Sequence, residues 1–236
     1  MMPALVPPAP SLRSLYIAGP AGRMEGLLNE GGPKATCSAL VCHPHPLGGG
    51  TMHNKVVYHA MKVLNDPQWG FEWPVLRFNF RGTGLSAGSH HGNTESGDVE
   101  AATRWLRAKF RLPVVVIGFS FGAAMVVKAC CGHQCPSGIQ ALAAIGLPIH
   151  AQDRDYTYPG LGACTLPKLF VSGDRDEFAS CDDLTQIVAT ASDPKQLVFV
   201  PDADHFFTGQ LTALQTALAD WLTRVACPPL QPTHPV

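Results

Sequence analysis

The chain of 236 residues carries a formal net charge of −1 at pH 7, with 46% hydrophobic and 15% charged residues. This composition is typical of a compact globular enzyme and argues against a disordered chain. Because the sequence contains no long basic or acidic run, we expect neither nucleic acid nor an anionic membrane surface as a partner.

The N-terminal segment, MMPALVPPAPSL, has neither the charged start nor the apolar core of a secretory signal. No apolar stretch approaches the roughly 18–20 residues needed to cross a bilayer. These observations favour a cytoplasmic protein without a membrane partner. The eight cysteines are accordingly expected to be thiols, several of them acting as small core residues.

Apolar runs bounded by glycine and proline alternate with helical patterns from residue 12 onward. Going along the chain, strands are expected over 12–18, 24–29, 37–42, 75–80, 113–118, 141–147, 168–172 and 196–200. Helices are expected over 54–64, 98–110, 182–191 and 208–225, and another should start directly after the strand 113–118. This alternation predicts an α/β fold with a doubly wound, mostly parallel sheet of about eight strands.

A single domain is expected over 12–226, because the sequence shows no repeat or linker. An N-terminal extension precedes it over 1–11, and the proline-rich tail over 227–236 is expected to be disordered. Only about twenty residues separate Leu147 from Leu169. This short interval predicts a loop, with no helical cap domain over the sheet edge.

The strongest motif is Gly118-Phe119-Ser120-Phe121-Gly122, which fits G-x-S-x-G between a buried strand and a helix. A serine at the apex of such a sharp turn presents its hydroxyl at the carboxyl edge of the sheet. The glycines are needed because side chains at their positions would collide with neighbouring elements. The motif predicts Ser120 as a nucleophile; the alternative is a glycine-rich turn that only packs helix on sheet.

A serine hydroxyl needs a histidine base and an orienting carboxylate, which follow it in the order acid, then histidine. His205 follows the last predicted strand, at the expected edge of the sheet, and His150 is a less favoured alternative. The loop after the preceding strand contains both Asp174 and Asp176. Asp176 lies further from the strand end and is preferred as the acid.

An oxyanion hole needs two convergent N–H donors. The first is predicted to be the backbone N–H of Phe121, the residue after the nucleophile. The second should come from the loop after the strand 37–42, where two prolines have no N–H to donate. His45 and Leu47 remain as candidates, with a slight preference for His45.

Phenylalanines flank the proposed catalytic groups, and Phe119, Phe206 and Phe207 are predicted to line an apolar substrate pocket, with burial in the core as the alternative. No metal is expected. The histidines near His43 lie in a rigid proline loop without an acidic partner, and the cysteines near Cys130 lack a second pair at zinc-site spacing. No cofactor is expected either, because no glycine-rich loop follows the first strand as in dinucleotide-binding proteins.

Several segments resemble the HPHP-containing bacterial α/β-hydrolases. They are His43-Pro-His-Pro-Leu-Gly-Gly with the following Thr51-Met52 and Asn54–Val57, then Leu76–Gly82, Gly118–Ala123 and Asp202–Phe207. The resemblance extends from about residue 12 to residue 225 and implies the α/β-hydrolase fold with Ser120, Asp176 and His205 as triad. Asn79 departs from the Asp that many α/β-hydrolases outside this family carry, and it is expected to organise the loop.

The residues and the resemblance together predict a serine hydrolase that cleaves carboxylic esters of short acyl chains through an acyl-enzyme intermediate. The expected partner is a small-molecule ester bound in an open site. Acyltransferase, thioesterase or peptidase activity with the same triad are the alternatives among enzymes. A ligand-binding α/β-hydrolase homologue without turnover is the alternative from another class, since a fold does not fix a function.

Overall fold

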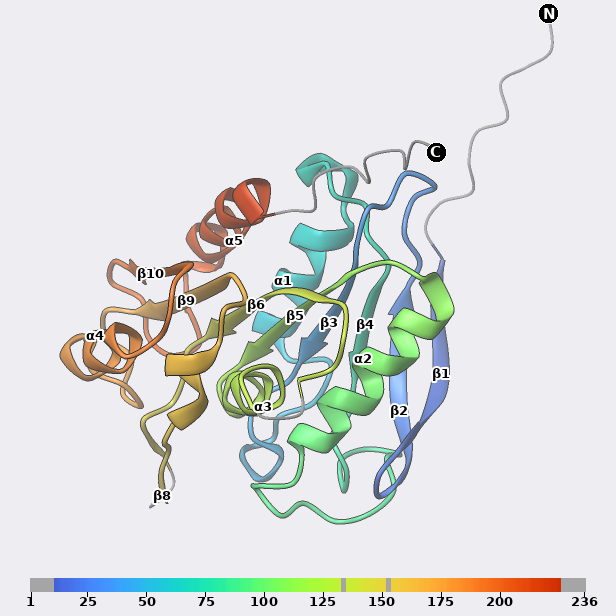
Figure 1. Ribbon diagram of the computed structural model, residues 1–236, viewed down its shortest axis with the longest axis horizontal. Helices are drawn as coiled ribbons and strands as arrows, with labels where there is room; N and C mark the ends of the chain where they lie inside the picture. The colour runs from blue at the N-terminus through green and yellow to red at the C-terminus, as the bar shows by residue number, and fades with distance from the viewer. Residues whose placement is uncertain (1–10, 133–134, 152–153, 226–236) are drawn as a thin grey trace, which may run out of the picture.

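The computed structural model describes residues 11–132, 135–151 and 154–225 (Figure 1). The tail predicted to be disordered, 227–236, lies outside the described residues. So does the predicted N-terminal extension, apart from its last residue.

An eight-stranded sheet runs through the molecule in the order β1-β2-β4-β3-β5-β6-β9-β10. The strands are β1 (Leu12–Gly19), β2 (Gly22–Asn29), β3 (Ser38–Cys42), β4 (Val75–Phe78), β5 (Val114–Phe119), β6 (Ile139–Ile145), β9 (Lys168–Gly173) and β10 (Lys195–Val200). The pairs β1–β2 and β2–β4 are antiparallel, and every other neighbouring pair in this sheet is parallel. The predicted fold class is therefore confirmed.

In the described part of the chain, five α-helices cover the two faces of the sheet (Figure 1). Their bounds are α1 (Lys55–Asn65), α2 (Ser96–Phe110), α3 (Phe121–Cys130), α4 (Cys181–Ala189) and α5 (Leu211–Val225). One apolar core unites buried residues of α1 and α5 with one face of the sheet, and the other unites α2, α3 and α4 with the opposite face. The helices form because their apolar residues recur with helical spacing and so make a stripe that the sheet can bury.

The central strand β5 shows how the sequence determines its place. All six of its residues are buried, and four of them are valine or isoleucine, which suits a parallel strand covered on both faces. Because β3, β5, β9 and β10 are parallel to their neighbours, their carboxyl ends meet at one edge of the sheet. This edge is where ligands bind in open α/β sheets.

The connection between β6 and β9 carries more structure than the loop predicted from the sequence. It contains a two-stranded antiparallel hairpin, β7 (His150–Ala151) with β8 (Arg154–Asp155), and a short 3-10 helix, η3 (Pro159–Ala163). The described part of this connection has no α-helix, in agreement with the predicted absence of a helical cap domain. Across the described residues, no helix is both long and apolar enough to span a bilayer.

Candidate active site

Ser120 occupies the sharp turn between β5 and α3. Its backbone has φ 56° and ψ −122°, and its side chain makes no capping hydrogen bond to α3, so the hydroxyl is not used to build the helix. A Cβ at Gly122 would lie 2.6 Å from the carbonyl oxygens of Cys42 and His43, and a Cβ at Gly118 would collide with the backbone of Gly122. The two glycines thus allow α3 to pack directly against β3 and hold Ser120 in a strained conformation.

Asp176 and His205 come from loops after neighbouring strands and meet at the same edge. The Nδ1 atom of His205 lies 2.8 Å from Oδ2 of Asp176, and both side chains are almost fully buried. The same Asp176 carboxylate accepts a hydrogen bond from the Ser172 hydroxyl at 2.9 Å and another from the backbone N–H of Phe178 at 2.9 Å. A carboxylate held by these bonds accepts a hydrogen bond from Nδ1–H of His205, so Nε2 is the ring nitrogen that can take a proton from Ser120.

The two alternatives considered from the sequence lie elsewhere. Asp174 is exposed, and no hydrogen bond joins its carboxylate to His205. His150 is exposed on the β7–β8 hairpin, where its Nδ1 lies 2.7 Å from Asp155. Asp176 and His205 are therefore the acid and base that the geometry favours.

Three phenylalanine rings surround the imidazole of His205. Phe178 lies edge-on with ring centroids 4.5 Å apart, and Phe119 and Phe206 have centroids at 5.0 and 5.2 Å. Because Phe119 immediately precedes Ser120, its ring connects the nucleophile turn to the base. The backbone also links them, since the N–H of Ser120 donates to the carbonyl oxygen of Ile145 at 2.9 Å, next to Gly146.

Gly146 limits the space beside His205. It has φ +54°, and a Cβ there would lie 3.0 Å from Cε1 and 3.2 Å from Nδ1 of His205. We expect Gly146→Ala to displace the imidazole and to lower kcat/KM about 10- to 100-fold. The left-handed backbone should also cost about 1–2 kcal/mol of stability. Ester hydrolysis and urea unfolding would measure the two effects.

Gly70→Ala is the matched control for this prediction. Gly70 has φ +80° with no atom within 4 Å of an added Cβ, so it shares the backbone penalty without touching the site. An equal loss of activity in both variants would contradict a steric effect on His205.

Hydrogen bonding distinguishes the two candidates for the second oxyanion donor, His45 and Leu47. The N–H of Leu47 already donates to Nδ1 of His45 at 3.2 Å, and the Leu47 side chain is exposed. Among the described residues, the backbone N–H groups of His45 and Phe121 have no hydrogen-bond acceptor, and the centroids of the His45 and Phe121 rings are 5.0 Å apart. The geometry therefore favours His45 over Leu47 as the second donor.

Buried polar side chains hold the loop that carries His45. Asn79 accepts the N–H of Met52 at 2.9 Å and donates to Glu25 at 2.8 Å, so it does organise the loop as expected from the sequence. His43 is fully buried; its Nε2 accepts the N–H of Phe80 at 3.0 Å, so its Nδ1–H donates to the carbonyl oxygen of Pro44 at 2.7 Å. His43 therefore serves as a neutral brace between two loops.

This brace should make the fold sensitive to acid. Burial lowers the pKa of His43 from 6.5 to about 4. Between these values the unfolded chain binds a proton that the folded chain does not, so stability is complete above pH 6.5 and falls as the pH drops towards 4. We expect this histidine alone to remove about 3 kcal/mol over that interval. Urea unfolding at several pH values would measure it.

The His43→Gln variant provides the comparison, because it lacks this proton and should show a shallower decline. His53→Gln removes an exposed histidine of the same loop, two residues before α1 begins. Its decline should match that of the wild type. Parallel curves for wild type and His43→Gln would show that the brace is not the acid-sensitive group.

The three phenylalanines predicted to line a substrate pocket differ in burial. Phe207 is fully buried in the core beside α5, so its prediction is wrong, and Phe119 is 1% exposed and packs on His205. Phe206 is 49% exposed beside His205 and can contact a ligand. The consecutive residues point to opposite sides, which the sequence alone did not distinguish.

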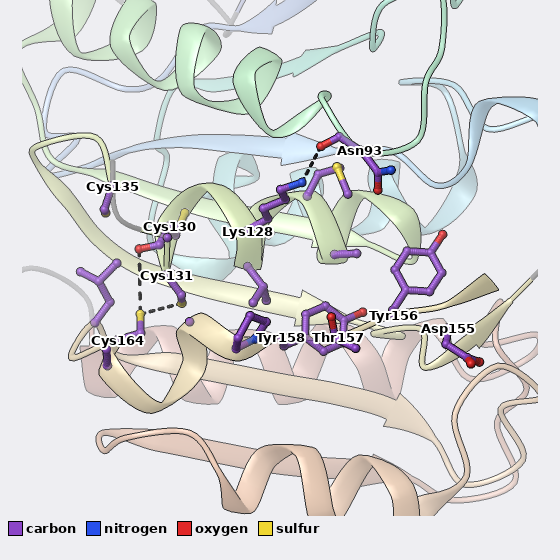
Figure 2. A pocket seen from close by; sticks show the side chains of 18 of the residues that line it. Asn93, Lys128, Cys130, Cys131, Cys135, Asp155, Tyr156, Thr157, Tyr158 and Cys164 are labelled. Carbon is purple, nitrogen blue, oxygen red and sulfur yellow. Dashed lines mark hydrogen bonds between the residues drawn. The ribbon is translucent and has the colours of Figure 1, made fainter.

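Two adjacent cavities lie next to this edge of the sheet. The smaller, about 310 Å³, adjoins the oxyanion loop and is lined by His45, Leu47, His90, His91, Ala151, Arg154 and Tyr156. The larger, about 760 Å³, extends along α3 and shares Arg154 and Tyr156 with it (Figure 2). Within the described ranges, no group of three or more His, Cys, Asp or Glu side chains is arranged to hold a metal ion.

The model of the alpha/beta hydrolase domain matches residues 39–226. This chain belongs to the α/β-hydrolase family. An uncharacterised protein of Rickettsia prowazekii is 34% identical over 222 residues, which are 89% of each chain. Among solved structures, an α/β serine hydrolase without lid from Xanthomonas campestris is 32% identical with a TM-score of 0.77, covering 95% of this chain and 99% of that one. A serine hydrolase homologue from Coxiella burnetii is also 32% identical, with a TM-score of 0.75 and coverages of 88% and 96%.

Three residues at this α/β-hydrolase site were missed by sequence reasoning. Ser172 and Phe178 both bind the Asp176 carboxylate, and Gly146 leaves room for His205. Ser172 and Phe178 lie only four and two residues from Asp176, so proximity to the proposed acid was the available signal. Nothing in the local sequence distinguished Gly146.

Proposed function

We propose that this chain is a carboxylesterase that works through an acyl-enzyme intermediate. The observation that carries the proposal is the buried Asp176–His205 hydrogen bond of 2.8 Å at the edge where Ser120 is held in a strained turn. This combination matches the roles of acid, base and nucleophile in serine hydrolases. The membership of the α/β-hydrolase family and the two serine-hydrolase structures similar to this chain support it.

The reaction has two halves. The Ser120 Oγ attacks the ester carbonyl carbon while Nε2 of His205 takes the hydroxyl proton, and the proton then passes to the departing alcohol. Water attacks the resulting acyl-serine with the same proton transfers in reverse order, which releases the acid. Asp176 keeps Nδ1 protonated and stabilises the imidazolium that forms in each half.

The negative oxygen of each tetrahedral intermediate needs donors that are already in place. The backbone N–H of Phe121 lies at the start of α3, where the helix dipole also favours an anion. The N–H of His45 is the second donor in this proposal, because that of Leu47 is engaged. Two fixed donors lower the barrier in both halves of the reaction.

The proposed substrates are small esters with short acyl chains. The connection between β6 and β9 forms a short hairpin and a 3-10 helix instead of a helical cap, and the relative from Xanthomonas campestris is described as lacking a lid. Phe206 offers one exposed apolar ring beside His205. A long chain would find little covered apolar surface at such an open edge.

Hydrolysis of p-nitrophenyl esters from acetate to palmitate, together with fluorophosphonate labelling, tests the proposal. We expect turnover that is highest with the short esters, and a labelled peptide in which mass spectrometry places the phosphonate on Ser120. Turnover of thioesters alone would support a thioesterase instead. If the protein neither hydrolysed any ester nor reacted with the fluorophosphonate, the esterase proposal would be wrong. A ligand-binding homologue without catalytic activity would then be the favoured hypothesis.

A further inference from the structure

Cys131 and Cys164 meet at one end of the larger cavity (Figure 2). Their Sγ atoms lie 2.6 Å apart, and the Cys131 thiol donates to the Cys164 sulfur. Cys131 is the C-cap of α3 and Cys164 is the C-cap of η3. The pair therefore connects the helix that starts at the nucleophile turn to the segment that forms the opposite wall of the cavity.

The packing around the two cysteines fixes their relative position. A Cβ at Gly160 would collide with the carbonyl oxygen of Cys131, so the backbones of η3 and α3 are in direct contact. Lys168 is fully buried, and its ammonium group donates to the carbonyl oxygens of Cys164 and Leu166. The Sγ–Sγ separation of 2.6 Å is only roughly half an ångström longer than a disulfide bond of about 2.05 Å.

The two thiols have unequal acidity. The hydrogen bond from Cys131 lowers the pKa of Cys164, with help from the nearby Lys168 charge, and the same bond raises the pKa of Cys131. A thiolate is the reactive form of cysteine. Cys164 is thus the nucleophile of the pair, and Cys131 is placed to act as its resolving thiol.

We propose that Cys131 and Cys164 are a redox-active pair, which a hydroperoxide oxidises to a disulfide and a small-molecule thiol reduces again. The Cys164 thiolate attacks one oxygen of the hydroperoxide, which breaks the O–O bond, forms a sulfenic acid and, after protonation, releases an alcohol or water. The Cys131 sulfur then attacks the Cys164 sulfur, which forms the S–S bond and releases the hydroxyl group with the Cys131 proton as water. Two thiols are oxidised and one peroxide is reduced.

The cavity supplies access for these reagents. Although both cysteines are at least nine-tenths buried, they line a space of about 760 Å³ that a small peroxide or thiol can enter.

The other described cysteines are not paired in this way. Among the described residues, the thiols of Cys42, Cys130, Cys135 and Cys181 are free and have no sulfur partner. Cys37 is disulfide-bonded, which corrects the expectation that all cysteines are thiols.

Peptide mapping after peroxide treatment tests the proposal without any substrate, so its outcome is separate from that of the esterase assay. Reduced protein is treated with hydrogen peroxide, unfolded, alkylated and digested with trypsin. Cleavage after Lys128, Arg154 and Lys168 gives the peptides 129–154 and 155–168. We expect these to be joined by a disulfide, with the mass of two hydrogen atoms lost, and to separate again after incubation with dithiothreitol.

Variants identify the sulfurs involved. Cys131→Ser and Cys164→Ser should each lower the yield of joined peptides at least about tenfold. The double variant Cys130→Ala with Cys135→Ala should keep it, because these cysteines share the first peptide but have no part in the proposal. Full alkylation of Cys131 and Cys164 after peroxide treatment, or a disulfide that persists in Cys131→Ser, would overturn the proposal.

Discussion

Ser120→Ala should lower kcat for a short p-nitrophenyl ester by about a million-fold, because without the hydroxyl no acyl-enzyme can form and the His205 base has nothing to activate. Binding and the oxyanion donors would leave a small residual rate above that of water. The variant should also lose fluorophosphonate labelling completely. Initial rates, corrected for spontaneous hydrolysis, measure the effect.

Ser14→Ala is a suitable control for this result, since Ser14 is exposed on the edge strand β1 and takes no part in the site. It should keep wild-type kcat. Circular dichroism and thermal unfolding of Ser120→Ala should resemble the wild type, because alanine removes one oxygen from a partly buried position. Residual activity within tenfold of the wild type would mean that Ser120 is not the nucleophile.

Asp176→Asn is expected to lower kcat about ten-thousand-fold while leaving KM nearly unchanged. The amide of asparagine can donate a hydrogen bond to Nδ1 of His205, so the neutral imidazole carries its proton on Nε2 instead. Nε2 then faces Ser120 as a donor and cannot accept the hydroxyl proton. The side chains at positions 176 and 205 would keep their 2.8 Å contact, but His205 would no longer act as a base. Steady-state kinetics with a short ester distinguish this loss in kcat from a loss in binding.

The neighbouring Asp174→Asn provides the matched control. Asp174 lies on the same loop, is exposed and has no hydrogen bond from its carboxylate to His205, so its substitution should change kcat less than twofold. The comparison also decides between the two acids considered from the sequence. A larger loss in Asp174→Asn than in Asp176→Asn would assign the acid to Asp174.

The positions of the strands along the chain and the nucleophile turn could be predicted from the sequence because their signals are local. The β-branched residues of β5 and the glycines around Ser120 each restrict the backbone within a few residues. The edge where the loops meet follows from the parallel topology. Local patterns and the rule for parallel sheets are therefore enough to predict which loops meet at this edge.

Contacts between distant segments could not be predicted in this way. Gly146 follows β6, yet the limit on its side chain is set by His205, 59 positions later in the sequence. Phe206 and Phe207 are identical, adjacent residues that differ in burial, because the loop directs the Phe206 ring towards solvent and the Phe207 ring into the core. The hairpin β7–β8 is too short to leave a periodic pattern, and it forms where the chain folds back between two strands of the sheet.

The connection from β6 to β9 contributes neither nucleophile, base nor acid, and it leaves the sheet and returns to it on neighbouring strands. The β7–β8 hairpin is the part of it that could be exchanged, since η3 carries the buried Leu161 and, at its C-cap, the Cys164 that meets Cys131. Loop closure costs only about 0.6 kcal/mol for each doubling of length. A laboratory or an evolving lineage could therefore exchange this segment for a longer one and change which molecules reach Ser120 without rebuilding the catalytic groups.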